Sequence, residues 1–140
     1  MGSPPLKGRF ALVVDDDISI RTRVMHILKK MGLQVMGAEN ADVAFDLLQT
    51  RHPDIALLFT DVRMPGKLDG FVLARNVAKS WPHISIVVTS GDGAPGLSCM
   101  PDTARFIAKP FSARLVRACL QEILSNGPKL RPLKRGQVED

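Results

Sequence analysis

The chain has 140 residues, the usual size of a single domain. Hydrophobic residues make up 45% of it and charged residues 24%, which provides for a packed core and excludes a disordered chain. No apolar run reaches the roughly 18 residues that cross a membrane, no secretory signal opens the sequence, and Cys99 and Cys119 match no disulfide or metal framework. We therefore expect a cytoplasmic protein that makes no contact with a membrane.

The formal net charge of +5 raises the question of nucleic-acid binding, so the distribution of that charge matters. Residues 1–9 and residues 126–140 each carry a net charge of +2, which leaves +1 for the residues between them. We interpret residues 1–8 as an N-terminal extension, residues 9–125 as the folded domain and residues 126–140 as a basic tail. This distribution predicts no direct binding to nucleic acid, and the alternative role for the tail is contact with an acidic partner.

Five short apolar runs, spaced along the whole domain, predict β-strands. In chain order they are residues 10–14, 34–38, 55–60, 84–89 and 105–108. The third and fourth runs are apolar without alternation, as expected of strands that are covered on both faces.

The first two segments between these runs have the spacing of helices. Apolar residues recur every three or four positions from Ile20 to Met31, and Gly32 is expected to end that helix. A second helix is expected to follow Asn40 as its N-cap and to close at Pro53. The side chains that we expect it to bury are Val43, Ala44, Leu47 and Leu48.

The second half of the domain continues the same alternation. A helix after Gly70 is predicted to turn one apolar side toward the sheet, with Phe71, Ala74, Val77, Ala78 and Trp81. From residue 91 to 101, glycine and proline limit any helix to a short one. The last helix is expected to follow Ser112 as its N-cap. Its predicted buried stripe consists of Leu115, Val116, Cys119, Leu120 and Ile123.

Strands that alternate with helices predict a three-layer α/β fold, in which a five-stranded parallel sheet carries helices on both faces. In such folds ligands bind at the carboxyl ends of the strands. The polar residues that follow the predicted strands are therefore the candidates for function. They are Asp15, Asp16 and Asp17 after the first strand, Asp61 after the third, Thr89 and Ser90 at the fourth and Lys109 after the fifth.

Carboxylates gathered at one edge repel one another unless some are protonated or a cation lies among them. Carboxylate oxygens with room for water suit Mg²⁺, so we predict a site for metal-assisted phosphoryl transfer. Asp61 is the candidate nucleophile, and Asp16 and Asp61 are the candidate metal ligands, with Asp15 acting through water. Lys109 and the Thr89 hydroxyl are placed to donate to phosphoryl oxygens.

These residues lie in motifs that resemble the receiver domain of two-component response regulators. The motifs are Val13-Val-Asp-Asp16, Phe59-Thr-Asp-Val-Arg-Met-Pro65, Asp69-Gly70, Val88-Thr-Ser-Gly91 and Ala108-Lys-Pro-Phe111. They occur in the family's order over about residues 8–125. The resemblance implies the flavodoxin-like receiver fold and a phosphorylation-dependent signalling switch in a phosphorelay. A histidine kinase or a histidine phosphotransfer protein would supply the phosphoryl group from a phosphohistidine.

The resemblance also implies a role for each matching residue. Asp61 would be the phosphoacceptor, and the backbone carbonyl of Arg63 would join Asp15, Asp16 and Asp61 around Mg²⁺. Thr89 and Phe106 would form the switch pair. Lys109 would contact the phosphoryl group or Asp61, and its bond to the following proline would be cis.

Three departures from the family pattern stand out. The loop from Pro65 to Asp69 is one residue longer than the commonest form, and residues 91–101 make a poor fourth helix, which puts the family's usual output surface in question. Arg63 adds a bulky cation beside the predicted pocket, where it would either shield the acyl phosphate from water or recruit a partner.

Several alternatives compete with these assignments. The three consecutive aspartates could form only a turn that caps the first helix, and Phe106 could be an ordinary core aromatic. A phosphatase of the haloacid dehalogenase type also uses a strand-end aspartate, a hydroxyl and a lysine, but it needs an acid where this chain has Arg63. Residues 91–96 match a dinucleotide-binding pattern in a context that does not fit it, so no cofactor other than Mg²⁺ is expected. We therefore expect a switch that catalyses only its own phosphorylation and dephosphorylation.

Overall fold

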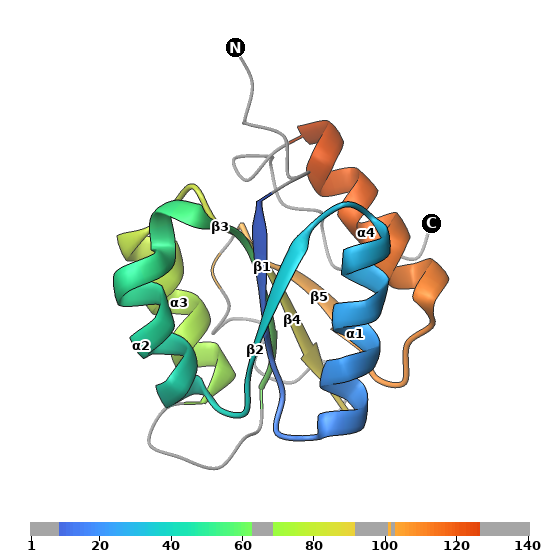
Figure 1. Cartoon of the computed structure of the whole chain (residues 1–140), viewed down its shortest axis with the longest axis horizontal. Helices are drawn as coiled ribbons and strands as arrows, with labels where there is room; N and C mark the ends of the chain where they lie inside the picture. The colour runs from blue at the N-terminus through green and yellow to red at the C-terminus, as the bar shows by residue number, and fades with distance from the viewer. Residues whose placement is uncertain (1–8, 63–68, 92–100, 102, 127–140) are drawn as a thin grey trace.

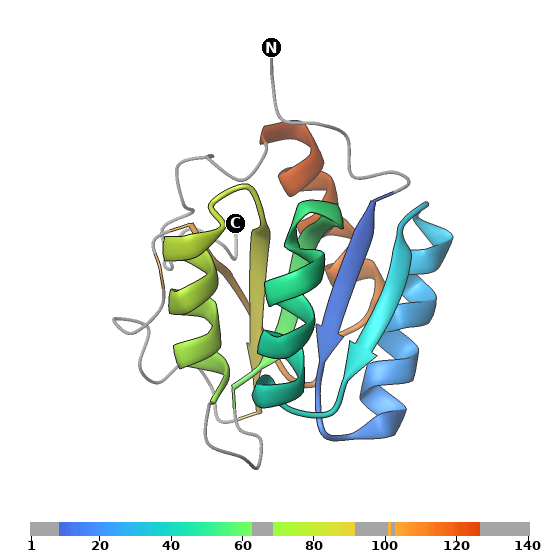
Figure 2. The same ribbon diagram turned by 60° about the vertical axis from the view of Figure 1, so that its left-hand side comes forward.

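The computed structural model describes residues 9–62, 69–91, 101 and 103–126. Its elements alternate along the chain as β1 (Phe10–Val14), α1 (Ile18–Lys30), β2 (Gln34–Ala38), α2 (Ala41–Arg51), the short 3₁₀ turn η1 (His52–Asp54), β3 (Ile55–Asp61), α3 (Gly70–Ser80), β4 (Ser85–Ser90), β5 (Arg105–Ala108) and α4 (Ala113–Asn126). The five strands form one parallel sheet in the order β2-β1-β3-β4-β5. Helices α2 and α3 cover one face and α1 and α4 the other, so the predicted three-layer α/β fold is confirmed (Figures 1 and 2).

Each helix begins where a short polar side chain accepts hydrogen bonds from the backbone of the first turn. Asp17 caps α1, Asn40 caps α2 through the backbone N–H of Val43, and Asp69 caps α3. The Ser112 hydroxyl accepts from the backbone N–H of residue 115 at the start of α4. The caps predicted at residues 40 and 112 are therefore confirmed.

The core lies in two apolar clusters, one on each face of the sheet. The cluster under α2 and α3 includes Ala44 and Leu48 from α2 and Leu73 and Val77 from α3. The cluster under α1 and α4 includes Val24, Ile27 and Leu28 from α1 and Val116, Leu120 and Ile123 from α4. Burial of these stripes holds the helices to the sheet, since apolar burial contributes about 25 cal/mol per Å².

Two details of the predicted packing were wrong. Val43 and Leu115 were expected to be buried, but they are 39% and 43% exposed. Both lie in the first turn of their helices, beside residues that are fully buried, Ala44 in α2 and Val116 in α4, so the buried stripe of each helix is narrower than predicted. Trp81 ends α3 as its C-cap residue and packs against the cluster under α2 and α3, as predicted. The segment 91–101, where only a short helix was expected, lies mostly outside the described residues.

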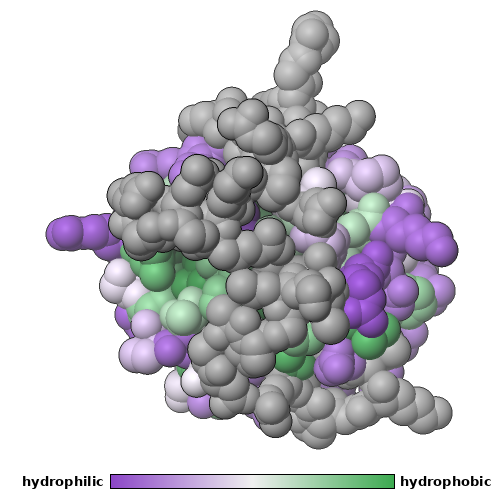
Figure 3. All heavy atoms as spheres, turned by 180° about the vertical axis from the view of Figure 1, so that it is seen from behind, coloured by the Kyte–Doolittle hydropathy of each residue, from purple (hydrophilic) through white to green (hydrophobic). Residues whose placement is uncertain are grey.

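The surface opposite the viewer of Figure 1 mixes apolar and polar side chains where described residues are visible (Figure 3). Ile18, at the start of α1, is the most exposed large apolar side chain among the described residues, at 65%. Within those residues, we find no helix with the length and apolar character needed to traverse a bilayer.

Candidate functional site

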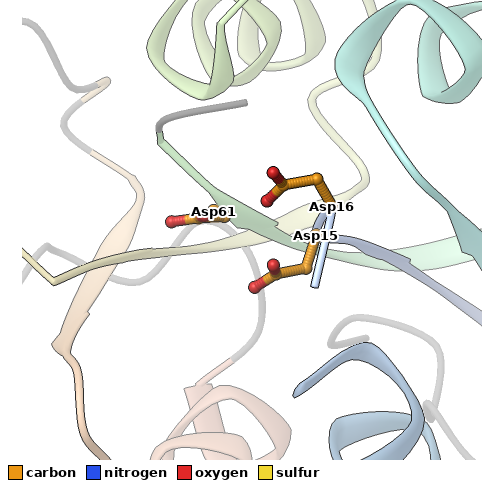
Figure 4. A group of neighbouring side chains, drawn as sticks. All are labelled: Asp15, Asp16 and Asp61. Atoms are coloured by element: carbon orange, nitrogen blue, oxygen red, sulfur yellow. The ribbon is translucent and has the colours of Figure 1, made fainter. Parts of the chain in front are cut away.

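Three carboxylates meet at the carboxyl edge of the sheet, the edge at which the parallel strands end. Asp15 and Asp16 follow β1, and Asp61 is the last residue of β3. The two strands are neighbours, with Val14 paired to Thr60, so their ends bring the three side chains together. One oxygen from each carboxylate lies within 4.8 Å of the others (Figure 4). Asp15 and Asp61 are buried, whereas Asp16 is exposed.

The three aspartates in the turn between β1 and α1 do not have the same role. Asp17 caps α1, because its Oδ1 accepts from the backbone N–H groups of Ser19 at 2.8 Å and of Ile20 at 3.3 Å. Asp15 instead points into the site, and its backbone N–H donates to the carbonyl of Ala38 on β2 at 3.2 Å. Helix capping therefore accounts for only one residue of the run.

Lys109 brings positive charge to the two buried carboxylates. Its Nζ lies 3.1 Å from Oδ2 of Asp15 and 3.2 Å from Oδ2 of Asp61. The backbone N–H of Lys109 donates to the carbonyl of Ser90 at 2.9 Å, and its peptide bond to Pro110 is cis, as the resemblance implied. The contact between Lys109 and Asp61 was predicted, and the contact with Asp15 was not.

The electrostatics of the site favour a cation. Burial raises the pKa of Asp61 and the negative charge of Asp15 raises it further, while Lys109 and the hydrogen bond from the Val62 N–H oppose the rise without cancelling it. Burial by itself would lower the pKa of Lys109, but the hydrogen bonds and charges of Asp15 and Asp61 raise it, so the ammonium stays protonated. One lysine therefore faces more negative charge than it neutralises.

The ligand atoms that the acidic cluster offers are suited to a magnesium ion. Asp15, Asp16 and Asp61 offer only oxygen, the ligand type that Mg²⁺ prefers, and exposed Asp16 leaves one side open to water. The fourth predicted ligand, the backbone carbonyl of Arg63, lies outside the described residues.

The two predicted switch residues occupy the neighbouring strands. Thr89 is buried on β4 and pairs in register with Asp61, which places the two residues side by side. Phe106 pairs with Val88 one strand further out, where it is half-buried and packs against the cluster under α2 and α3. The carboxyl edge thus brings together every predicted site residue that the structure describes, apart from Phe106, which lies behind it.

Comparison with known proteins decides the family. The family model for the response regulator receiver domain matches residues 11–121. The chain belongs to this family. Receiver domains are phosphorylation-dependent switches of two-component signalling, so the fold and the class of function expected from the motifs are both confirmed.

Individual relatives support the assignment. A chemotaxis protein CheY homolog from Campylobacter jejuni is 30% identical, over 83% of this chain and 92% of its own. The receiver domain of NtrX from Brucella abortus is 34% identical, with a TM-score of 0.72 over 82% of this chain and 98% of that one. A probable transcriptional regulator, ycf27 of Cyanophora paradoxa, is 33% identical over 81% of this chain, which spans only 47% of that regulator's length.

Two further residues, Gly70 and Arg21, lie against the site, although the sequence reasoning assigned them no role in it. Gly70 begins α3 directly against β3, and its backbone N–H donates to the carbonyl of Val62 at 2.8 Å. A Cβ at this position would overlap the backbone carbonyl oxygen of Asp61. The signal available was the Asp69-Gly70 pair itself, because a glycine just inside a helix start indicates a close backbone approach. Arg21, the other such residue, contacts the backbone beside the acidic cluster.

Proposed function

We propose that Asp61 is the phosphoacceptor of this receiver domain and that it takes its phosphoryl group from the phosphohistidine of a histidine kinase or a histidine phosphotransfer protein. One observation carries the proposal: the oxygens of Asp15, Asp16 and Asp61 cluster within 4.8 Å while Lys109 contacts two of the three residues. Carboxylates and an ammonium arranged around one carboxylate nucleophile are what phosphoryl transfer requires.

The proposed metal is Mg²⁺. Asp16 and Asp61 would hold it directly and Asp15 through a water molecule, with the Arg63 carbonyl as a further ligand. When bound, Mg²⁺ supplies positive charge that stabilises the oxygens of a transferring phosphoryl group. The excess of carboxylates over ammonium groups at this edge supports its presence.

The proposed reaction uses the side chains already in place. A carboxylate oxygen of Asp61 forms a bond to phosphorus as the bond from phosphorus to the donor's imidazole nitrogen breaks, and that nitrogen takes a proton and leaves. Lys109 stabilises the phosphoryl oxygens, to which the Thr89 hydroxyl also donates. Burial of Asp61 shields its carboxylate from solvent and so strengthens both interactions.

The proposed switch follows from the charge of the product. Phosphorylation replaces one carboxylate by a group with more negative charge and three acceptor oxygens. Thr89 would move toward these oxygens, and Phe106, half-buried beside it, would fill the space that Thr89 leaves. A bias of a few kcal/mol is enough to make a minor conformer the major one.

The alternative, a phosphatase of the haloacid dehalogenase type, receives less support. Those enzymes protonate the leaving group with an acid two residues after the nucleophile, where this chain has Arg63. We therefore propose that the chain catalyses only its own phosphorylation and dephosphorylation. A chromogenic phosphate ester should show no turnover, and steady turnover that depends on Asp61 would favour the phosphatase.

Intact mass after exposure to a small acyl phosphate tests the proposal. We expect the wild-type chain to gain one phosphoryl group with Mg²⁺ and none with a chelator. Asp61→Asn should gain none, while Asp46→Asn, which changes an exposed carboxylate on α2, should label as the wild type does. Undiminished labelling of Asp61→Asn would remove Asp61 from its role, and equal labelling with Mg²⁺ and with a chelator would overturn the requirement for the metal.

A further inference from the structure

Arg21 reaches from α1 to the backbone of the acidic cluster. Its Nη1 donates to the carbonyl oxygen of Asp15 at 2.6 Å. The arginine donates to a backbone carbonyl, whereas the carboxylates of Asp15 and Asp61 are contacted by Lys109. A charged donor on a carbonyl oxygen makes a stronger hydrogen bond than a neutral one, so this contact holds the peptide group firmly.

The peptide group that Arg21 holds is the one that joins Asp15 to Asp16. Its carbonyl belongs to Asp15 and its nitrogen to Asp16, so its orientation sets the direction in which the Asp16 side chain leaves the backbone. Asp15 has other restraints: its backbone N–H donates to Ala38, and its side chain accepts from the Asp17 N–H at 2.9 Å and contacts Lys109. Asp16, in contrast, is exposed.

The space that Arg21 occupies depends on a glycine in β2. A Cβ at Gly37 would lie 3.2 Å from Cδ of Arg21, 3.4 Å from its Nε and 3.1 Å from Sδ of Met25. The two shortest separations are tight, so a residue larger than glycine at position 37 would push the Arg21 stem and the Met25 sulfur away by a few tenths of an ångström. Gly37 is exposed and paired in register with Val13, so neither burial nor its place in the sheet requires a glycine.

We propose that Arg21 is a positioning residue for the metal site: it fixes the Asp15–Asp16 peptide so that Asp16 is set to bind Mg²⁺, and Gly37 leaves room for it to do so. This inference rests on the proposed function, because it concerns the same ion. It extends the set of functional residues to a helix side chain and a strand glycine that contact no phosphoryl group.

Charge and positioning predict opposite effects of removing Arg21. As a cation near the cluster, the arginine repels Mg²⁺, so charge alone predicts tighter metal binding in Arg21→Gln. If Arg21 positions Asp16, its loss should weaken Mg²⁺ binding by about tenfold, which is the lower end of the range for residues that orient metal ligands. Arg21→Lys keeps the charge and one donor and should fall between the wild type and Arg21→Gln.

The experiment measures Mg²⁺ dissociation constants by titration calorimetry, with the Mg²⁺-dependent rise in melting temperature as a second readout. We expect weaker binding in Arg21→Gln, partial recovery in Arg21→Lys and a weakening of a few fold in Gly37→Ala. Because Gly37→Ala acts through the arginine, it should have no further effect in the double variant. If Arg21→Gln does not fold, the Mg²⁺ affinity of Gly37→Ala alone still tests the proposal.

Unchanged or tighter Mg²⁺ binding in folded Arg21→Gln would overturn the positioning role, as would an equal effect of Gly37→Ala with and without Arg21. A wild-type chain that binds no Mg²⁺ would instead count against the proposed function. The two failures are therefore distinguishable.

Discussion

The two edges of the sheet differ in the kind of side chain that gathers there. At the amino edge, where the strands begin, the His52 ring stacks on Trp81 with centroids 5.0 Å apart, and Phe45 lies 6.0 Å from the same indole. The backbone carbonyl of His52 is 2.8 Å from Nε2 of His83. At the carboxyl edge, buried carboxylates crowd around one lysine, and burial and repulsion raise the pKa of Asp61.

The difference lies in charge: aromatic rings pack together at the amino edge, and like charges crowd at the carboxyl edge. Stacked rings and a bonded carbonyl at the amino edge lower the energy of the folded chain without a ligand. Desolvated like charges at the carboxyl edge raise it until a cation binds. A cluster that is unfavourable by itself, in a fold stabilised elsewhere, indicates a ligand site.

The largest expected effect comes from Gly70→Ala at the carboxyl edge. The added Cβ would overlap the Asp61 carbonyl, so α3 or the end of β3 must shift. We expect the free energy of unfolding to fall by about 3 kcal/mol, as for a severe overpacking, and phosphorylation of Asp61 to fall with it. Urea unfolding measures the first and intact mass the second. Gly91→Ala is the matched control, because a Cβ there meets nothing within 4 Å, and equal stability of the two variants would refute the overlap.

A smaller effect is expected at the amino edge from Trp81→Ala. Loss of the ring contacts with Phe45 and His52 should lower the free energy of unfolding by about 2 kcal/mol, less than for a fully buried aromatic because Trp81 is partly exposed. The Mg²⁺ dissociation constant should stay unchanged in calorimetry. A weakened Mg²⁺ affinity would show that the two edges of the sheet are energetically coupled.

The smallest effect is a pH dependence of the metal-free protein. The pKa of Asp61 is raised above its ordinary value of 3.8, so the unfolded chain loses this proton first and stability falls as pH rises from about 3.8 through the folded pKa. Asp61→Asn removes that loss and should be slightly more stable than the wild type at neutral pH.

Lys109 contributes to stability in the opposite direction at neutral pH. Its raised pKa increases the free energy of unfolding, and this contribution is lost only above about pH 10.5. Urea unfolding from pH 4 to 7 in a chelator, with Asp46→Asn as control, measures the difference between wild type and Asp61→Asn. If the wild type instead became more stable than Asp61→Asn as the pH rises, the attraction between Lys109 and Asp61 would outweigh the cost of burying the Asp61 carboxylate.

The sequence determined the order of strands and helices, because apolar spacing and cap residues are local. The strands at residues 10–14, 34–38 and 105–108 have the predicted bounds. The third strand ends one residue later than predicted, and the fourth begins and ends one residue later. It also identified Asp61, Asp16 and Lys109 as candidates, because parallel strands end at a common edge.

Only the tertiary structure decided how those residues share their contacts. Lys109 contacts Asp15 as well as Asp61, and Asp17 caps α1. The Arg21 guanidinium donates to the Asp15 carbonyl. The tertiary structure also exposed Val43 and Leu115, which their spacing had marked as buried. Spacing along a chain fixes which face a residue lies on, whereas the distance between atoms on different strands depends on register, sheet twist and packing, which no local pattern contains.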